Sequence, residues 1–181
     1  MKKLFSPFLY NMKRASLCFI SLSTFSFSLI SAQSLLNSKV PATQIKTING
    51  ATTNSSTFSN NGKPIIIDFW ATWCKPCIAE LDAINDEYAD WKKETGVKII
   101  AVSTDDARTM AKVQSFIREK GWDYDIYLDP NQDFQHAMEV INCPCTFILD
   151  GSGKIVYIHN SYMEGDEKGL HAALLKAAGK K

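Results

Sequence analysis

The sequence predicts an α/β domain in which a central mixed β-sheet is flanked by helices. The apolar runs 65–70 and 97–102 enclose a segment with helical periodicity, which is the pattern of a parallel βαβ unit. Later in the chain, two strand-like runs are joined by Asp150-Gly151-Ser152-Gly153, a strong hairpin signal. The chain has 181 residues, of which 45% are hydrophobic and 22% charged. This is enough for one domain with a substantial core.

Residues 1–32 have the features of a secretory signal peptide. A basic start is followed by the apolar, serine-containing run 15–30 and then by small residues. We expect cleavage after Ala32, or after Ser34 as the alternative. An uncleaved membrane anchor is disfavoured because the apolar run is short and interrupted by serines. The protein is therefore expected in the periplasm or cell envelope, as a single soluble domain over residues 33–181.

The charge of the chain is unevenly distributed. Four basic residues and no acidic residue lie in the first 32 positions, and Met12 offers an alternative start within them. Of the 20 basic residues of the chain, 16 remain after this segment, against 19 acidic ones, so the remainder has a net charge of −3. This balance argues against nucleic acid or an anionic membrane surface as a partner.

Each element of the first half follows from a local pattern. Weak alternation over 43–49 indicates an edge strand, and 52–62 is expected to be a surface connection. Residues 65–70 are continuously apolar except at Asp68, as in a central strand buried on both faces. The helix that begins at Cys74 has an apolar stripe at Ile78, Leu81, Ile84, Tyr88 and Trp91. Its polar positions, expected to face water, are Glu80, Asp82, Asp86, Glu87 and Lys92.

The second half continues the alternation of strands and helices. The expected elements are, in order, a strand over 97–102, a helix over 107–120, a strand over 124–128, a short helix around 134–140, hairpin strands over 146–149 and 154–159, and a helix over 166–178. The sequence Ser103-Thr104-Asp105 precedes the second helix and has the composition of a helix cap.

The motif Trp73-Cys74-Lys75-Pro76-Cys77 directly follows the buried strand. Unpaired N–H groups and the positive end of the helix dipole favour a thiolate at Cys74, and the thiolate is the form of cysteine that attacks disulfides. Cys77 lies three residues on, close enough to form a disulfide with Cys74. Pro76 is tolerated in the first helical turn, where its missing N–H has no helical partner. These features indicate a dithiol–disulfide exchange centre.

Other uses of the cysteines are less favoured. After export, Cys74, Cys77, Cys143 and Cys145 remain. Structural disulfides within these close pairs would close only small loops and stabilise little. A metal-binding or copper-chaperone module built on the four thiols is the main alternative function. It is disfavoured by a proline within each pair and by the absence of methionine or histidine ligands nearby. A peroxidase with a lone peroxidatic cysteine fits poorly. His136, His159 and His171 have no metal-ligand spacing and are expected at the surface.

The string from Ile67 to Cys77 closely resembles the active-site strand and turn of thioredoxins. Together with the additional strand–helix segment 97–128 and the signal peptide, the chain resembles the exported TlpA-like family over about residues 43–178. The resemblance implies a thioredoxin fold with an inserted strand–helix module and an envelope thiol–disulfide oxidoreductase. Some members of this branch serve cytochrome c maturation. It implies protein thiol or disulfide substrates and no cofactor. A reductase, slightly favoured here, needs a membrane dithiol donor of the DsbD type, whereas an oxidase or isomerase needs an oxidising partner.

The resemblance also implies roles for residues of the motif. Cys74 matches the nucleophile that forms a mixed disulfide with the substrate, and Cys77 matches the resolving thiol that releases it. Asp68 matches the buried acid beneath the motif, where burial raises its pKa and lets it exchange a proton with Cys77. Trp73 is expected to shield the disulfide, with plain packing as the alternative. Lys75 is expected to favour the Cys74 thiolate, although an exposed lysine is screened.

Pro144 matches the cis-proline of the family, which faces the two cysteines and leaves the preceding backbone free to pair with an extended substrate. Here the chain departs from the family pattern, because Cys143 precedes the proline and Cys145 follows it. Three interpretations remain open: Cys143 is a third redox thiol, Cys143 and Cys145 form their own disulfide, or both are inert packing residues. Alternation along a strand places the two side chains on the same face.

Overall fold

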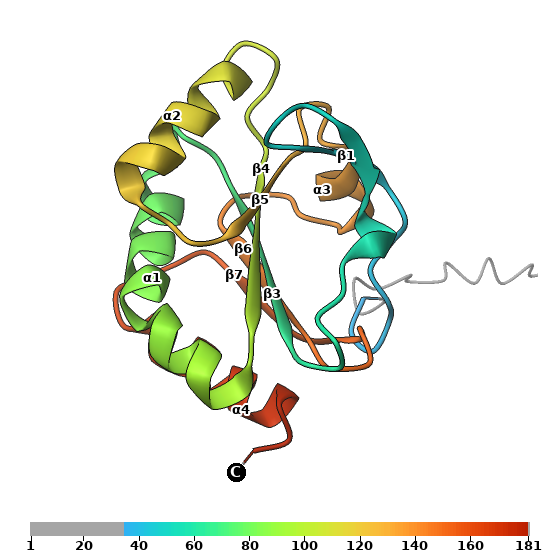
Figure 1. The fold of residues 1–181 in the computed structure, drawn as a ribbon, viewed down its shortest axis with the longest axis vertical. Helices are drawn as coiled ribbons and strands as arrows, with labels where there is room; N and C mark the ends of the chain where they lie inside the picture. Colours follow the sequence, from blue (N-terminus) through green and yellow to red (C-terminus); the bar gives the residue numbers. More distant parts are fainter. Residues whose placement is uncertain (1–34, 181) are drawn as a thin grey trace, which may run out of the picture. The chain divides into compact units, whose positions relative to one another are not determined.

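The computed structural model describes residues 35–180, and a seven-stranded sheet runs through this part of the chain (Figure 1). The signal peptide prediction and the alternative start at Met12 lie outside the described residues. The strands lie in the order β2-β1-β5-β4-β3-β6-β7. Their bounds are Gln44–Thr47 for β1, Thr52–Asn54 for β2, Ile65–Trp70 for β3, Lys98–Ser103 for β4, Asp125–Leu128 for β5, Cys145–Leu149 for β6 and Ile155–Asn160 for β7.

The sheet is mixed, as the sequence predicts. Strands β3, β4 and β5 are parallel, and the helices α1 (Lys75–Thr95) and α2 (Met110–Lys120) connect them. Strand β6 pairs antiparallel with β3 and forms the predicted hairpin with β7. The architecture confirms an α/β domain whose central strand, β3, leads directly into the Cys-x-x-Cys motif.

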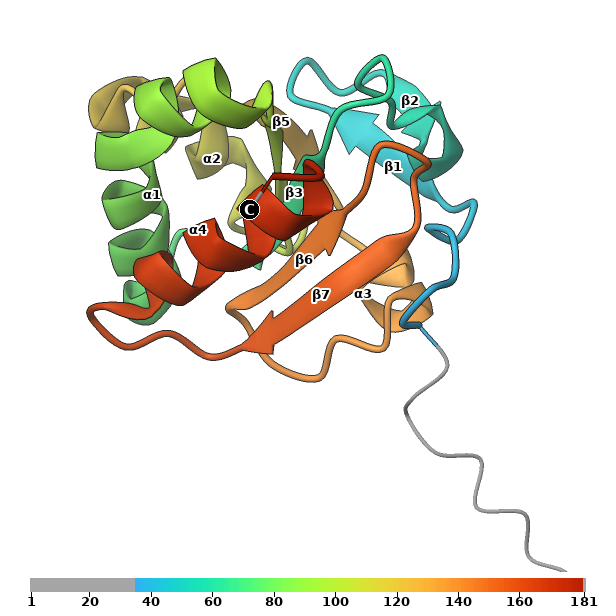
Figure 2. The ribbon, with the colours of Figure 1, turned by 90° about the horizontal axis from the view of Figure 1, so that it is seen from below.

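The helices cover the two faces of the sheet unequally (Figure 2). Helices α1, α2 and α4 (Asp166–Ala177) pack on one face, and the short α3 (Asp133–Ala137) packs on the other. Alternation along β3 distributes its side chains between them. Ile66 and Trp70 belong to the core under α1, whereas Ile67 and Phe69 belong to the core under α3. By the same alternation, Asp68 faces α1.

The segment predicted as a surface connection contains a strand. Strand β2 pairs antiparallel with β1, with Ile45 opposite Thr53. β-branched threonines at the edge of a sheet make this pairing favourable, although the segment carries too few apolar residues to signal a strand. A single turn of 3-10 helix, η1 (Ser55–Thr57), follows, and the Asn54 side chain caps it by accepting the N–H of Ser56.

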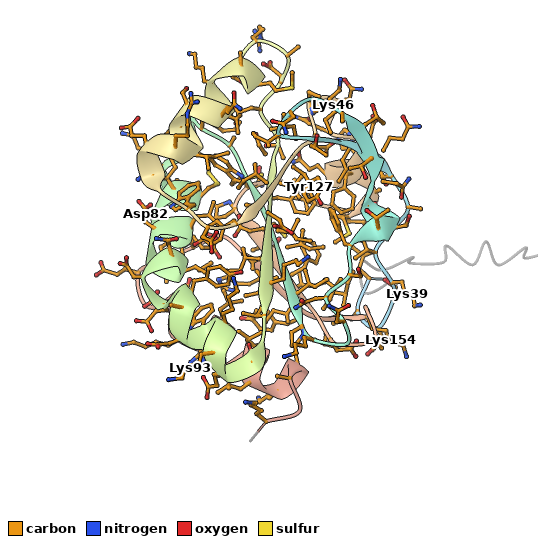
Figure 3. The ribbon with its side chains drawn as sticks, in the orientation of Figure 1. Lys39, Lys46, Asp82, Lys93, Tyr127 and Lys154 are labelled. Atoms are coloured by element: carbon orange, nitrogen blue, oxygen red, sulfur yellow. A yellow bond between two sulfur atoms is a disulfide. The ribbon has the colours of Figure 1, made fainter. Side chains whose placement is uncertain are left out.

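The start of the described chain is attached to the β6–β7 hairpin. Lys39 pairs with Lys154 in an isolated antiparallel bridge, and the two residues lie side by side in Figure 3. The amide of Asn37 also donates to the Ile155 carbonyl at 2.8 Å. In residues 35–180 no helix has the length and apolar character needed to cross a membrane.

Candidate active site

Cys74 and Cys77 form a disulfide at the first turn of α1, with their Cα atoms 5.3 Å apart. Cys74 is the N-cap residue, in extended conformation, and its sulfur accepts the N–H of Cys77 at 3.3 Å. Pro76 lies in the first turn, where it removes no helical hydrogen bond. Cys74 is 5% exposed and Cys77 is fully buried. When the bond is reduced, the helix N-terminus therefore stabilises a thiolate on the more accessible sulfur.

Trp73 and Lys75 flank Cys74 and both point outward. The Trp73 side chain is 65% exposed, so it adds an apolar surface beside the disulfide. Lys75 is also exposed and makes no ion pair in the described part of the chain. Solvent screens its charge accordingly.

Asp105, a residue with no role in the sequence-based site, holds the turn before the motif. Its carboxylate is fully buried and accepts the backbone N–H of Thr72 at 2.8 Å and the Thr72 hydroxyl at 2.6 Å. The Ser103 hydroxyl donates to the same carboxylate at 2.9 Å. The cap-like sequence 103–105 therefore does not cap α2. It connects the end of β4 to the cysteine turn, and only a contact between residues 33 positions apart reveals this.

Two carboxyl groups lie buried together beneath the motif. Asp68, on β3, is fully buried, and Glu80, on α1, is 2% exposed. The prediction that Glu80 faces water is therefore wrong. Its position carried the signal: Glu80 follows Cys77 by three residues and precedes Ile84 by four, so it lies on the inner stripe of the helix. We expected Glu80 to face water because its side chain is charged.

The Thr146 hydroxyl bridges these carboxyl groups, at 2.7 Å from Glu80 Oε1 and 3.0 Å from Asp68 Oδ2. A hydroxyl has one proton, so it donates a hydrogen bond to one carboxylate and can bond to the other carboxyl group only by accepting a hydrogen bond from its protonated form. Burial, with the neighbouring Glu80, holds the pKa of Asp68 well above its usual range. Burial also raises the pKa of Glu80 to about 7, and Asp166 adds to this shift. The pair therefore holds at least one proton near neutral pH.

The turn between α3 and β6 carries the second pair of cysteines. The peptide bond between Cys143 and Pro144 is cis, and the Pro144 carbonyl accepts the N–H of Ser161 at 2.9 Å. Cys143 and Cys145 are free thiols, the first half-buried and the second buried. Burial raises the pKa of Cys143 to about 11 and that of Cys145 to about 12.

Both free thiols contact the core under α3, but their further contacts differ. Cys145 belongs to the core under α3, whereas Cys143 borders both cores, including the one that contains Cys74 and Cys77. The Cys143 sulfur lies 3.7 Å from the Thr104 hydroxyl. Cys143 therefore borders the core that contains the two cysteines of the motif, which Cys145 does not.

A groove of about 1020 Å³ passes the motif on the Pro144 side. Pro76, Cys143 and Pro144 are among its lining residues, and polar side chains, including that of Glu139, interrupt its apolar walls. The apolar wall residues include Met138, Val140, Ile141, Phe147 and Ile158. Ile141 is exposed, so an apolar ligand segment in the groove removes its surface from water.

The arrangement does not suit a metal. In residues 35–180 there is no group of three or more His, Cys, Asp or Glu residues that could hold a metal ion. The metal-binding alternative is therefore disfavoured on geometry. Of the histidines, His136 is exposed, whereas the other two are half-buried. His159 contacts Asp166 at 3.2 Å, and His171 contacts Glu94 at 2.9 Å while stacking on Trp91.

Comparisons with known proteins point to one family. A family model described as the AhpC/TSA family matches residues 36–158. An uncharacterized thioredoxin-like protein from Porphyromonas gingivalis is 46% identical, with a TM-score of 0.70, over 77% of this chain and 92% of that chain. The structure of a candidate thiol:disulfide interchange protein DsbE from Chlorobium tepidum covers 80% of this chain and 98% of its own, at 24% identity and a TM-score of 0.69. At that identity the likeness shows the fold alone.

Curated relatives match a shorter region. The thiol-disulfide oxidoreductase ResA of Bacillus thuringiensis (strain Al Hakam) is 36% identical over 95 residues, which is 52% of this chain and 53% of the relative. The corresponding protein of Geobacillus kaustophilus (strain HTA426) is 31% identical over 115 residues, 64% of either chain. The chain thus spans about half to two thirds of the length of the curated relatives it matches.

Proposed function

The chain belongs to the thioredoxin-like AhpC/TSA family, and on that premise we propose that it is a thiol–disulfide oxidoreductase that acts on protein substrates. The observation that carries the proposal is the Cys74–Cys77 disulfide at the first turn of α1, beside a groove and above a buried carboxyl pair. Its relatives named thiol-disulfide oxidoreductases support the same chemistry.

In the reducing direction, the Cys74 thiolate attacks one sulfur of a substrate disulfide, and the other substrate sulfur leaves as a thiolate. Cys77 then loses its proton, attacks the Cys74 sulfur and releases the second substrate thiolate. The substrate gains two electrons and the protein returns to the Cys74–Cys77 disulfide. We assign the proton from Cys77 to the Asp68–Glu80 pair, because a carboxyl whose pKa is near neutrality accepts and returns protons most efficiently.

The charges around the motif favour the reducing direction. A strongly oxidising protein stabilises its thiolate, whereas a carboxylate beneath the cysteines destabilises one. Its charge reaches neighbouring thiols, since Asp68 contributes to the raised pKa of both Cys143 and Cys145. A reductase in an oxidising compartment requires an electron source, so we propose a membrane dithiol donor.

The equilibrium potential against glutathione tests the direction. We expect a value near about −270 mV, as for thioredoxin, and reduction of insulin disulfides by the reduced protein. Cys74→Ser abolishes the activity if the nucleophile is assigned correctly. A value near about −120 mV would mean that the protein forms disulfides instead. Full activity of Cys74→Ser would remove the proposal.

We further propose that the protein acts in the bacterial envelope, after cleavage of residues 1–32, and that cytochrome c maturation is the process it serves. The supporting features are the signal-like sequence and the groove beside the motif, which suits an extended polypeptide. The N-terminal sequence of the exported protein tests the first part. For the second, an oxidised Cys-x-x-Cys-His peptide, the attachment sequence of c-type haem, should be reduced faster than insulin. Equal rates would argue for a general reductase.

A further inference from the structure

Cys143 lies beside the cysteine motif, and we propose that it is a second resolving thiol. In this role it attacks Cys74 in the mixed disulfide with a substrate, releases the substrate and forms a Cys74–Cys143 disulfide. The inference rests on the proposed function, because it requires Cys74 to form mixed disulfides. It gives the protein a second oxidised state in addition to the Cys74–Cys77 disulfide of the structure.

The strand register brings Cys143 to the start of the motif. Strands β3 and β6 are antiparallel, with Phe69 opposite Cys145. Cys143 lies two residues before β6, beyond the cis bond to Pro144, and Ala71 directly follows the end of β3. The carbonyl of Ala71 accepts the N–H of Cys74 at 3.0 Å. The pairing thus brings the turn that carries Cys143 to the end of β3 from which the Cys74 turn begins.

Contacts of the Cys143 side chain agree with this placement. It packs against the core cluster that contains Cys74 and Cys77. The Thr104 hydroxyl next to its sulfur also donates to the carbonyl of Trp70, at 3.2 Å, at the end of β3. Cys143 and Pro76 line the same groove, so both cysteine turns are present at one surface of the protein.

The reaction is an internal exchange that needs no further reagent. The Cys143 thiolate attacks the Cys74 sulfur, the bond between Cys74 and the substrate breaks, and the substrate sulfur leaves with the electron pair and takes a proton from water. Cys74 and Cys143 are oxidised to a disulfide while the substrate thiol is fully reduced. Reduction of the new bond by Cys77 returns the protein to its usual oxidised form.

The surroundings of Cys143 make this route slower than an ordinary exchange, but do not prevent it. Burial and the Asp68 charge raise the pKa of Cys143 to about 11, and the hydrogen bond between Cys143 and Thr104 opposes this rise. About 10⁻⁴ of such a thiol is ionised near pH 7, but its greater basicity makes the thiolate roughly tenfold more nucleophilic. The result is about 30-fold slower than for a thiol with the ordinary pKa of about 8.5 in the same position, and the rate rises about tenfold per pH unit.

Ellman's reagent, an aromatic disulfide that releases a coloured thiolate, provides the test. In Cys77→Ala, Cys74 takes up the aromatic thiol and releases the first coloured thiolate. We expect Cys143 to displace the second one in a later, pH-dependent step. The product should be a protein without adduct, in which mass spectrometry of peptides finds Cys74 linked to Cys143.

Two double variants identify the attacking thiol. Cys77→Ala with Cys143→Ala should release the first thiolate and retain the second, whereas Cys77→Ala with Cys145→Ala should release both. Cys145 is the matched control because it lies two residues away, in the core under α3. Cys74→Ala with Cys77→Ala measures direct labelling of Cys143, which should be slow.

The outcomes separate the inference from the function on which it rests. A stable adduct on Cys77→Ala between about pH 7 and about pH 9, where the expected rate rises about 100-fold, would overturn the role of Cys143 while leaving Cys74 as the nucleophile. A Cys74–Cys145 link, or release unaffected by loss of Cys143, would overturn it as well. If Cys74 takes up no adduct at all, the proposed function itself fails.

Discussion

Glu80→Gln should make the stability of the protein less dependent on pH. The substitution removes the buried titrating group but keeps an oxygen that accepts the Thr146 hydroxyl, as Glu80 Oε1 does at 2.7 Å. In the folded protein the pKa of Glu80 is raised from 4.5 to about 7, mainly by burial. A carboxyl with a raised pKa binds more protons in the folded than in the unfolded state within this interval. The free energy of unfolding therefore falls as pH rises from about 4.5 to about 7.

The size of the effect follows from the shift. At about 1.4 kcal/mol per pKa unit, the rise from 4.5 to about 7 corresponds to about 3 kcal/mol of stability that is present in acid and lost above neutrality. The Glu80→Gln variant lacks this pH-dependent contribution to the free energy of unfolding. Relative to the wild type, the variant should gain stability as pH rises, by an amount on the order of 3 kcal/mol between about pH 5 and about pH 8.

Urea unfolding of the oxidised protein, followed by fluorescence of its four tryptophans, measures the difference at each pH. Glu87→Gln is the matched control, because Glu87 lies on the same helix and is exposed. It should leave the slope with pH as in the wild type. Parallel pH profiles for Glu80→Gln and the wild type would refute the argument, and would mean that Asp68 alone carries the proton of the pair.

Three further predictions concern neighbouring side chains. Asp68→Asn should slow the release of substrate from the mixed disulfide on the order of 10²-fold near neutral pH and flatten its pH profile, measured by stopped-flow kinetics, while unfolding in urea remains cooperative. Thr146→Val should lower stability by about 1–3 kcal/mol, more at high pH, because two buried carboxylates then lose their bridge. Asp105→Asn should weaken the turn before Cys74: we expect a loss of about 1–3 kcal/mol in urea unfolding and faster hydrogen exchange at the Thr72 amide. Unchanged exchange at Thr72 would show that the turn is held by other contacts.

The sequence predicted most of the fold because its main elements are encoded locally. The apolar run of β3, the helical stripe of α1 and the turn of the β6–β7 hairpin are each formed by residues that are close together in the sequence. The Cys-x-x-Cys motif was equally visible. The periodicity did not reveal that Glu80 is buried. This residue occupies an inner position of α1, but a charged side chain is assigned to solvent unless its partners are known. Thr146 is 66 residues away, so the pairing emerges only in the folded chain.

Asp105 and β2 illustrate two other limits. A short polar sequence before a helix has the same composition whether it caps that helix or holds a distant turn, and only the tertiary contact distinguishes the two. Strand β2 has three residues at the edge of the sheet, too few for an alternating pattern to stand out.

Residues 103–105, at the end of β4, contact both of the turns that carry cysteines. Asp105 fixes Thr72, next to the motif, and Thr104 contacts Cys143, next to Pro144. Strand β4 belongs to the module between α1 and β5, which lies outside the motif itself. Substitutions of Thr104 or Asp105 should therefore change the spacing between the two cysteine turns, although neither residue belongs to the motif.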